Sequence, residues 1–215
     1  TGHKLSQKIL LKVLNFQMGH IPGPIHILTY RREWFGANFL DCLQHGLREM
    51  TAWSMPEAEL MAAFVSKLNR CEYWTGDHTA VAVLGLEEKM VNAALDDWQT
   101  APLEPRLKAA FAYLDKLILA PKDLGVADII ELRESGLSDR AIEEVAYVAY
   151  LFSVMDRLAD TFDFDIPNEN LVSNTAQFLY KHGYKLAKMI RWISLGRAFK
   201  PIDVQNVVSK GKKMS

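Results

Sequence analysis

The sequence predicts an all-α protein, and three observations carry this prediction. No segment shows the sustained alternation of apolar and polar residues that marks a half-buried strand. Apolar residues instead recur at helical spacing in many segments, which prolines and glycines separate. With 215 residues, of which 49% are hydrophobic, the chain can bury a sizeable core. We expect a single domain over residues 1–208 and a disordered, lysine-rich tail at 209–215.

The first part of the chain contains two helical patterns. Apolar residues between Leu5 and Met18 predict a helix, which the glycines and prolines of residues 19–24 end. The second pattern covers residues 30–50 and carries an apolar stripe made of Trp34, Phe35, Phe39, Leu43 and Leu47. Cys42 lies within it and is expected to be a small buried apolar residue.

The residues from Ser54 onward are typical of a helix start. Ser54 is a suitable N-cap, a proline follows in the first turn, and Glu57 stands three residues after the cap. We expect this helix to end near Asn69. A second helix should begin around Cys71 and run to about residue 84.

Five further helices are predicted downstream. They cover residues 87–98, 106–119, 126–133, 140–161 and about 168–195. Pro121 ends the second of them, Gly136 closes the third and Ser138 caps the fourth. The last helix is basic on one side, through Lys181, Lys185, Lys188 and Arg191, as in amphipathic helices that pack on their own protein or on a neighbouring subunit.

Composition narrows the partners and the compartment. The chain has 25 basic and 26 acidic side chains, so it lacks the basic excess of nucleic-acid binders. Its two cysteines, Cys42 and Cys71, make no disulfide framework and suit a reducing cytoplasm. There is no long apolar stretch and no apolar core of a signal peptide. We expect a cytoplasmic protein without nucleic-acid or membrane partners, acting on a small molecule.

Residues 59–78 hold the strongest candidate for a functional site. Cys71 and His78 lie seven residues apart, two helical turns, and Glu59 stands on the preceding helix. A thiol, a base and an orienting acid are the parts of an activated nucleophile. At a helix N-terminus, Cys71 should have its thiol pKa lowered by the helix dipole. We therefore take Glu59, Cys71 and His78 as the candidate catalytic residues.

A faint internal repeat suggests two related helical halves. Ser54 precedes Glu59 by five residues, and Ser138 precedes Glu143 by the same number. This offset sets Met155 opposite Cys71, and Phe162 opposite His78. A chance match of two capped helices explains the same pattern equally well.

The spacing in residues 59–78 resembles the signature of the alkylhydroperoxidase D (AhpD) and carboxymuconolactone decarboxylase superfamily. That signature places a glutamate twelve residues before a C-x-x-C pair and a histidine four residues after its second cysteine. Further stretches are similar to the peroxidase-related branch, namely residues 19–24, 30–31, 63–69, 106–119, 132–138 and 157–160. The resemblance implies an AhpD-like helical fold and a homo-oligomer, either a dimer or a hexamer.

This sequence departs from the signature at Trp74, which stands where the second cysteine belongs. The resemblance implies that the second cysteine attacks a hydroperoxide, the first resolves the product as a disulfide, and the glutamate and histidine relay the proton. Cys71 occupies the resolving position, so no C-x-x-C disulfide can form here.

Three hypotheses follow for the site. In the first, Cys71 reduces organic hydroperoxides with a Glu59/His78 proton relay, and an external thiol reductant or Cys42 regenerates it. In the second, a redox-inactive decarboxylase or lyase uses His78 and Glu59 on a small carboxylated substrate, with Arg31, Arg32 or Arg157 as candidate cations. In the third, the cluster is a structural or binding relic.

The neighbours of the cluster complete the expectations. Tyr73 and Trp74 are predicted to line the substrate pocket, and Asp77 is predicted to lie on a solvated face. The spacing of Cys71 and His78 is not a recognised zinc pattern, and the other histidines are scattered, so we expect neither a metal nor another cofactor.

Overall fold

The computed structural model describes residues 3, 5–18, 20–30 and 39–184, and all regular structure in these residues is helical. This confirms the all-α prediction. The α-helices are α1 (Leu5–Met18), α2 (Gly23–Tyr30), α4 (Phe39–Arg48), α5 (Met55–Leu68), α6 (Glu72–Ala82), α7 (Glu88–Asp96), α8 (Pro105–Leu119), α9 (Val126–Glu134), α10 (Asp139–Thr161) and α11 (Glu169–His182), with one 3-10 turn, η1 (Pro121–Asp123).

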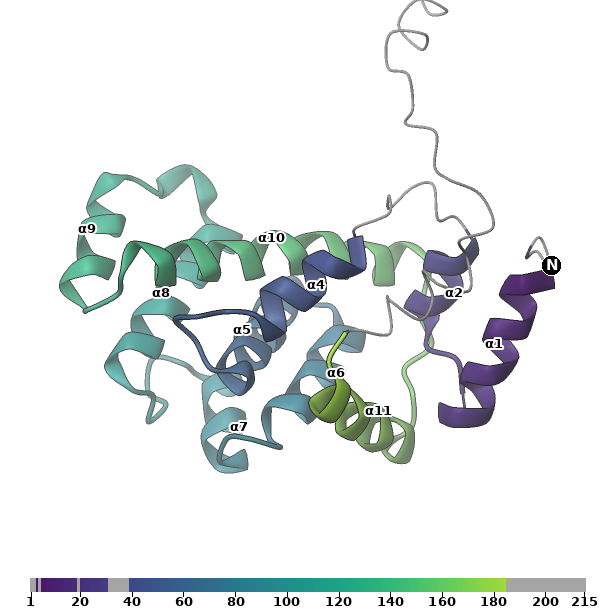
Figure 1. The fold of residues 1–215 in the computed structure, drawn as a ribbon. Coiled ribbons are helices and arrows are strands. Elements are labelled where there is room, and N and C mark those ends of the chain that lie inside the picture. Colours follow the sequence, from purple (N-terminus) through teal and green to yellow (C-terminus); the bar gives the residue numbers. More distant parts are fainter. Residues whose placement is uncertain (1–2, 4, 19, 31–38, 185–215) are drawn as a thin grey trace, which may run out of the picture.

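The longest described helix, α10, crosses the molecule, with α8 and α9 near one end and α1 and α2 near the other (Figure 1). Helix α5 lies deepest, because all residues from Ala58 to Ser66 are buried. It packs on α4, α6, α8 and α10. The largest fully buried apolar side chains come from these helices and are Leu47, Leu60, Met61, Phe111, Leu114, Leu151 and Phe152.

Both predicted caps are present. The Ser54 hydroxyl accepts a hydrogen bond from the Glu57 amide at 3.5 Å, and the Glu57 carboxylate accepts one from the Ser54 amide at 2.7 Å. The Ser138 hydroxyl accepts from the Ala141 amide at 3.2 Å. The two capped helices then differ, since α5 stops at Leu68 whereas α10 continues to Thr161. That stop is what turns the chain so that α6 can lie against α5.

The turn between α5 and α6 is a Schellman motif. The Cys71 amide donates to the Ser66 carbonyl at 2.9 Å, and the Arg70 amide donates to the Lys67 carbonyl at 3.0 Å. Arg70 adopts the left-handed conformation, with φ of 62°. Cys71 is at once the last residue of this turn and the N-cap of α6. The predicted helix start at Cys71 is therefore confirmed.

Several other predicted boundaries agree with the structure to within a few residues, but two predictions need correction. Helix α11 ends at His182, before Gly183 with its positive φ of 63°, and not near residue 195. Helix α1 ends at Met18 as expected, but α2 begins at Gly23, inside the stretch that was expected to break the helix. The predicted helix at residues 30–50 is found as α4 from Phe39, with Tyr30 ending α2. Residues 31–38 lie outside the described residues, as do Lys185, Lys188, Arg191 and the tail at 209–215. None of the described helices combines the length and the apolar character needed to span a membrane.

Candidate functional site

Glu59 and His78 meet in the interior where α5 packs against α6. The Glu59 side chain is completely buried, and its Oε2 is hydrogen-bonded to Nδ1 of His78, itself 2% exposed. The fold-back of α6 on α5 thus joins two of the three predicted site residues. A buried carboxylate requires compensation for its charge, because transfer from water into the interior is costly.

Arg48 and Tyr184 supply that compensation. Arg48, at the end of α4, forms an ion pair with Oε1 of Glu59. The Tyr184 hydroxyl donates to the same oxygen at 3.2 Å, and its ring lies 4.9 Å from the guanidinium carbon. Burial by itself raises the pKa of Glu59, but the charges and hydrogen bonds of His78 and Arg48 outweigh it and hold this pKa below 4.5. Glu59 is therefore ionised.

Two backbone carbonyls also hold the Arg48 guanidinium in place. Its Nη1 donates to the Leu47 carbonyl at 2.7 Å, and its Nη2 donates to the Leu179 carbonyl at 3.1 Å, near the end of α11. The sequence interpretation missed Arg48 and Tyr184. The signal that was available is the costly burial of Glu59, which demands a cation, but no spacing rule identifies which of the chain's arginines provides it.

One of the two ring nitrogens of His78 is bound to Glu59 and the other is not. Since the ionised Glu59 can only accept a hydrogen bond, we assign the Nδ1 proton to His78, and in the neutral form of the ring the lone pair is then on Nε2. Nε2 is buried and has no hydrogen-bond partner. The edge of the imidazole meets the Phe152 ring, with centroids 4.5 Å apart and planes at 84°. A buried polar nitrogen without a partner is costly, so Nε2 is open to a group that the described residues do not supply.

Trp74 occupies the helical position one turn before His78, and the two rings lie with centroids 5.4 Å apart. Its indole N–H donates to the Met155 carbonyl at 3.0 Å, which ties α6 to α10. Cys71 lies two turns before His78, a rise of about 10 Å along the helix axis. The position beside the imidazole therefore belongs to the indole and not to the thiol.

The expected activation of Cys71 by the helix dipole is wrong. Cys71 is 1% exposed, and burial raises the pKa of its thiol to about 12, with Asp156 and Asp160 adding to the rise. A backbone hydrogen bond from Trp74 acts in the opposite direction but is outweighed. Within the described residues, no hydrogen bond joins the thiol to His78. The structure thus leaves Cys71 as a buried, protonated thiol.

Asp77 does not lie on a solvated face, so that prediction is wrong as well. It is 8% exposed, on a helix that packs against α5, α10 and α11. Burial raises its pKa to about 6, the Glu59 charge raises it further, and His78 opposes the rise. Tyr73, one turn earlier, is 5% exposed, and its buried hydroxyl has no hydrogen bond of good geometry to a described residue, although the Gly23 backbone lies near enough to lower its pKa. Burial and the Asp77 charge raise the pKa of this phenol, so it stays protonated.

A third buried acid was also missed by the sequence interpretation. Asp156 of α10 is completely buried and accepts hydrogen bonds at 2.8 Å from the Ser66 hydroxyl and from the Asn69 side-chain amide. Burial raises its pKa to about 6. These bonds join α10 to the end of α5, just before the turn that leads to Cys71.

The structure supports neither a cation for a substrate carboxylate nor a metal site among the predicted candidates that it describes. Arg157 is exposed on α10, where its Nη1 donates to the Ser153 carbonyl at 3.3 Å, while Arg31 and Arg32 lie outside the described residues. Across the described residues, no group of three or more His, Cys, Asp or Glu side chains could hold a metal ion.

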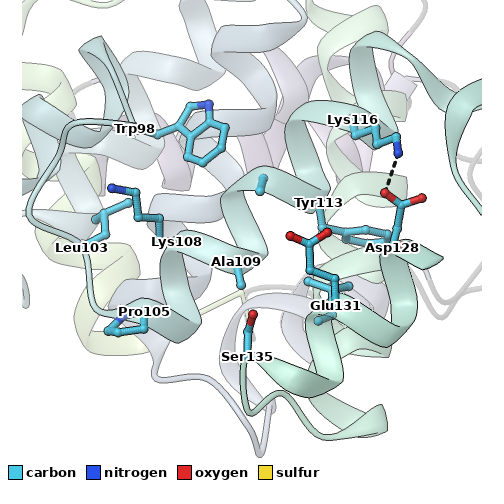
Figure 2. A pocket seen from close by; sticks show the side chains of 12 residues that line it. Trp98, Leu103, Pro105, Lys108, Ala109, Tyr113, Lys116, Asp128, Glu131 and Ser135 are labelled. Atoms are coloured by element: carbon cyan, nitrogen blue, oxygen red, sulfur yellow. Dashed lines mark hydrogen bonds and ion pairs between the residues drawn. The ribbon is translucent and has the colours of Figure 1, made fainter.

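A separate cavity of about 600 Å³ lies between α8, α9 and the loop before α8 (Figure 2). Trp98 and Tyr113 line it together with Lys108 and Glu131, and a Lys116–Asp128 ion pair borders it. Neither Glu59 nor His78 contributes to its wall. Its charged groups are partly exposed to solvent, whereas the cluster around His78 holds buried polar groups without partners. We therefore place the candidate site at His78.

No family model and no curated protein matches the sequence. Solved structures nevertheless share its fold. A peroxidase-related protein of uncharacterized function from a Silicibacter species superposes with a TM-score of 0.69 at 22% identity, covering 81% of this chain and 91% of its own. An AhpD-core, peroxidase-related protein from Ralstonia eutropha gives 0.66 at 19% identity, covering 80% and 91%. The debrominase Bmp8 gives 0.61 at 18%, covering 80% and 92%. The chain therefore has the AhpD-like helical fold.

Proposed function

We propose that this protein is an acid–base enzyme in which Nε2 of His78 removes a proton from a small substrate. The observation that carries this proposal is the buried Nε2 without a partner, on an imidazole whose other nitrogen is bound to Glu59. An imidazole held by a carboxylate is the usual arrangement of a general base.

The step requires no group outside the described cluster. The lone pair of Nε2 accepts the substrate proton, and the electron pair of the broken bond remains on the substrate. His78 becomes an imidazolium, which the Glu59 carboxylate stabilises through Nδ1. Arg48 and Tyr184 hold that carboxylate in one orientation, so the imidazole does not have to reorganise during proton transfer. The imidazolium then returns the proton to the product or to water.

Hydroperoxide reduction through Cys71 has less support. The nucleophile in that reaction is a thiolate, and a thiol with a pKa of about 12 is almost entirely protonated near neutral pH. The indole of Trp74, and not a thiol, adjoins His78. A decarboxylase of the second hypothesis also needs a cation for its substrate, and Arg48 is already paired with Glu59.

The aromatic surroundings of His78 favour a small aromatic substrate, and one structural neighbour was solved with such a molecule. A cysteine-to-alanine variant of the debrominase Bmp8 was solved in complex with 2,3,4-tribromopyrrole. At 18% identity, this likeness concerns the fold. In the present chain the aromatic rings of Trp74 and Phe152 flank His78, which suits a flat apolar molecule.

The base can be tested with 5-nitrobenzisoxazole, an uncharged aromatic carbon acid. A base removes its ring C–H proton, the electron pair forms a nitrile as the N–O bond breaks, and the oxygen leaves as a coloured phenolate. We expect turnover by the parent and by Cys71→Ser, and a loss of about a hundredfold or more in His78→Gln. His182→Gln, on the exposed side of α11, is the matched control. Equal rates for parent and His78→Gln would overturn the proposal.

The competing hypothesis has its own readout. The parent, Cys71→Ser and Trp74→Cys are mixed with tert-butyl hydroperoxide and dithiothreitol, and peroxide loss is followed together with cysteine oxidation by mass spectrometry. We expect peroxide loss only in Trp74→Cys, which restores a thiol one turn from His78. Peroxide consumption by the parent that disappears in Cys71→Ser would establish the hydroperoxidase instead.

A further inference from the structure

We propose that Tyr73 and Asp77 are the substrate-binding groups of this site, and that they select an uncharged aromatic substrate carrying a hydroxyl or carbonyl oxygen. This inference rests on the proposed function, because it assigns the groups that face the molecule from which His78 takes a proton. Neither residue belongs to the Glu59, C-x-x-C and histidine pattern from which the catalytic candidates were drawn.

The geometry places both residues on one side of α6. Tyr73 and Asp77 are four residues apart, so they share a helix face, and Asp77 is adjacent to His78 in the chain. The Asp77 charge acts on Tyr73, on Tyr184 and on the Glu59/His78 pair, so each of these groups responds to whether Asp77 is ionised. No hydrogen bond joins the Asp77 side chain to another described residue. The buried polar atoms of this face that lack a partner are the Tyr73 hydroxyl and Nε2 of His78, and a ligand can supply partners for these two.

The unpaired groups define what that ligand must offer. The Tyr73 hydroxyl stays protonated and can donate to a substrate oxygen, while Nε2 of His78 can accept a substrate proton. A phenol or a carbonyl compound provides such an oxygen next to an acidic O–H or C–H. When the proton moves to His78, the negative charge that develops on the oxygen is stabilised by the Tyr73 donor.

The charges of the site decide against an anionic substrate. Glu59 is ionised, and Asp77 becomes ionised as the pH rises above its pKa of about 6. Among the described side chains that contact these groups, the one permanent cation is Arg48, which already pairs with Glu59 and donates to two backbone carbonyls. Arg48 keeps one buried donor, Nε, without a partner, but Glu59 already balances its charge, so a substrate carboxylate would add uncompensated negative charge to a buried site, which is expensive.

Aromatic rings pack around these polar groups. The Tyr73 ring meets the Trp74 ring edge to face at 4.9 Å and the Phe164 ring at 5.4 Å. On the other side, Trp74 and His78 both contact Phe152, at 6.4 Å and 4.5 Å between centroids. Rings in these orientations stack favourably with a further aromatic ring and offer little to a polar aliphatic molecule.

The test is a binding comparison of two flat probes, 4-nitrophenol and 4-nitrobenzoate, by calorimetry at about pH 6, close to the Asp77 pKa. At this pH the phenol is largely uncharged and the benzoate is an anion. We expect the parent to bind 4-nitrophenol at least about tenfold more tightly. Tyr73→Phe, which removes only the hydroxyl, should weaken 4-nitrophenol binding about tenfold. Asp77→Asn should strengthen the binding of 4-nitrobenzoate and so reduce the difference in affinity between the two probes.

Tyr150→Phe and Asp123→Asn are the matched controls, because both side chains are exposed and far from α6 in the chain. They should bind both probes like the parent, and thermal unfolding of every variant verifies folding. The inference is overturned if the parent binds neither probe, or if Tyr73→Phe and Asp77→Asn retain the parent's two affinities. Binding needs no proton transfer. Selective binding without turnover of 5-nitrobenzisoxazole would therefore reject the catalytic role of His78 while retaining the binding role of Tyr73 and Asp77.

Discussion

Two ionisable residues in the same buried region, Glu59 and Cys71, are kept in opposite protonation states by their immediate contacts. Glu59 meets Arg48, His78 and the Tyr184 hydroxyl, all of which favour its charged form. Among the residues that the structure describes, no cation acts on Cys71, and the acids beside it favour the neutral thiol. At the scale of single residues, the site therefore carries its negative charge on a carboxylate and holds its thiol inert.

Slow modification of Cys71 follows from this difference. We expect iodoacetamide to label Cys42, which is partly exposed, well before Cys71 in the folded protein near neutral pH. In urea both cysteines should react at similar rates. Mass spectrometry of the labelled peptides measures the two rates. Rapid labelling of Cys71 in the native protein would contradict the burial and the raised thiol pKa on which the proposed function relies.

The Arg48–Glu59 pair also makes a stability prediction. Arg48→Met leaves the buried Glu59 carboxylate without its cation, so the free energy of unfolding should fall by about 3–5 kcal/mol. The double variant Arg48→Met/Glu59→Gln removes both charges and should recover part of the loss. Urea unfolding of the parent, the two single variants and the double variant measures this coupling. Strictly additive losses would mean that the two side chains are not coupled.

At the scale of elements, the turn between α5 and α6 decides which side chains reach His78. Arg70 holds the left-handed conformation in this turn without being a glycine, which costs about 1 kcal/mol. Arg70→Gly should therefore leave the stability unchanged or raise it by up to about 1 kcal/mol. Gly136→Ala is the reverse control, because φ is 87° there and no neighbour lies within 4 Å of the added methyl. It should lose about 1 kcal/mol in thermal or urea unfolding. A clear loss in Arg70→Gly would indicate that the arginine side chain holds the turn.

At this scale, the sequence could predict helix boundaries that depend on local signals, but not packing that depends on distant helices. Caps, proline stops and apolar periodicity are local signals, so the starts at Ser54, Cys71 and Ser138 were predictable. The contact between Glu59 and His78 followed from the family spacing. The surroundings of Asp77 depend on α11, nearly a hundred residues away, and local sequence carries no signal for that packing.

At the scale of the whole molecule, the site is assembled from distant segments. Glu59 comes from α5, His78 from α6, Arg48 from α4 and Tyr184 from the residue pair that follows α11. The Gln44 side chain, also on α4, accepts from the Tyr184 amide at 2.9 Å and so fixes the end of α11 against α4. Polar contacts with the cluster around Glu59 and His78 therefore also hold these helices together. Changes in the charge of this cluster should affect the stability of the entire fold.

The effect of charge on the stability of the fold can be measured through the titration of Asp77 and Asp156. Each has a folded-state pKa of about 6, above the ordinary value of 3.8. Between these two values the folded protein binds more protons than the unfolded chain, so the free energy of unfolding falls as the pH rises. The fall amounts to about 3 kcal/mol for each residue if the whole shift is realised. The groups that act on Asp77 are Tyr73, His78, Glu59 and Tyr184, and those that act on Asp156 are Ser66, Asn69, His78 and Asp160.

Asp77→Asn isolates one of the two contributions, since this side chain has no hydrogen bond to another described residue that the amide would lose. Urea unfolding of the parent at about pH 5 and about pH 7 should give a lower free energy of unfolding at the higher pH, and Asp77→Asn should reduce that difference. Glu59 works in the opposite direction but in a lower range, because its lowered pKa makes stability decline only as the pH falls below about 4.5. An unchanged difference in Asp77→Asn would mean that Asp77 is ionised in the folded protein at no cost. In that case the Asp77 charge, which we propose disfavours anionic substrates, would be present throughout this pH range. The preference for 4-nitrophenol over 4-nitrobenzoate should then stay the same between about pH 7 and about pH 5, whereas protonation of Asp77 would reduce it at the lower pH.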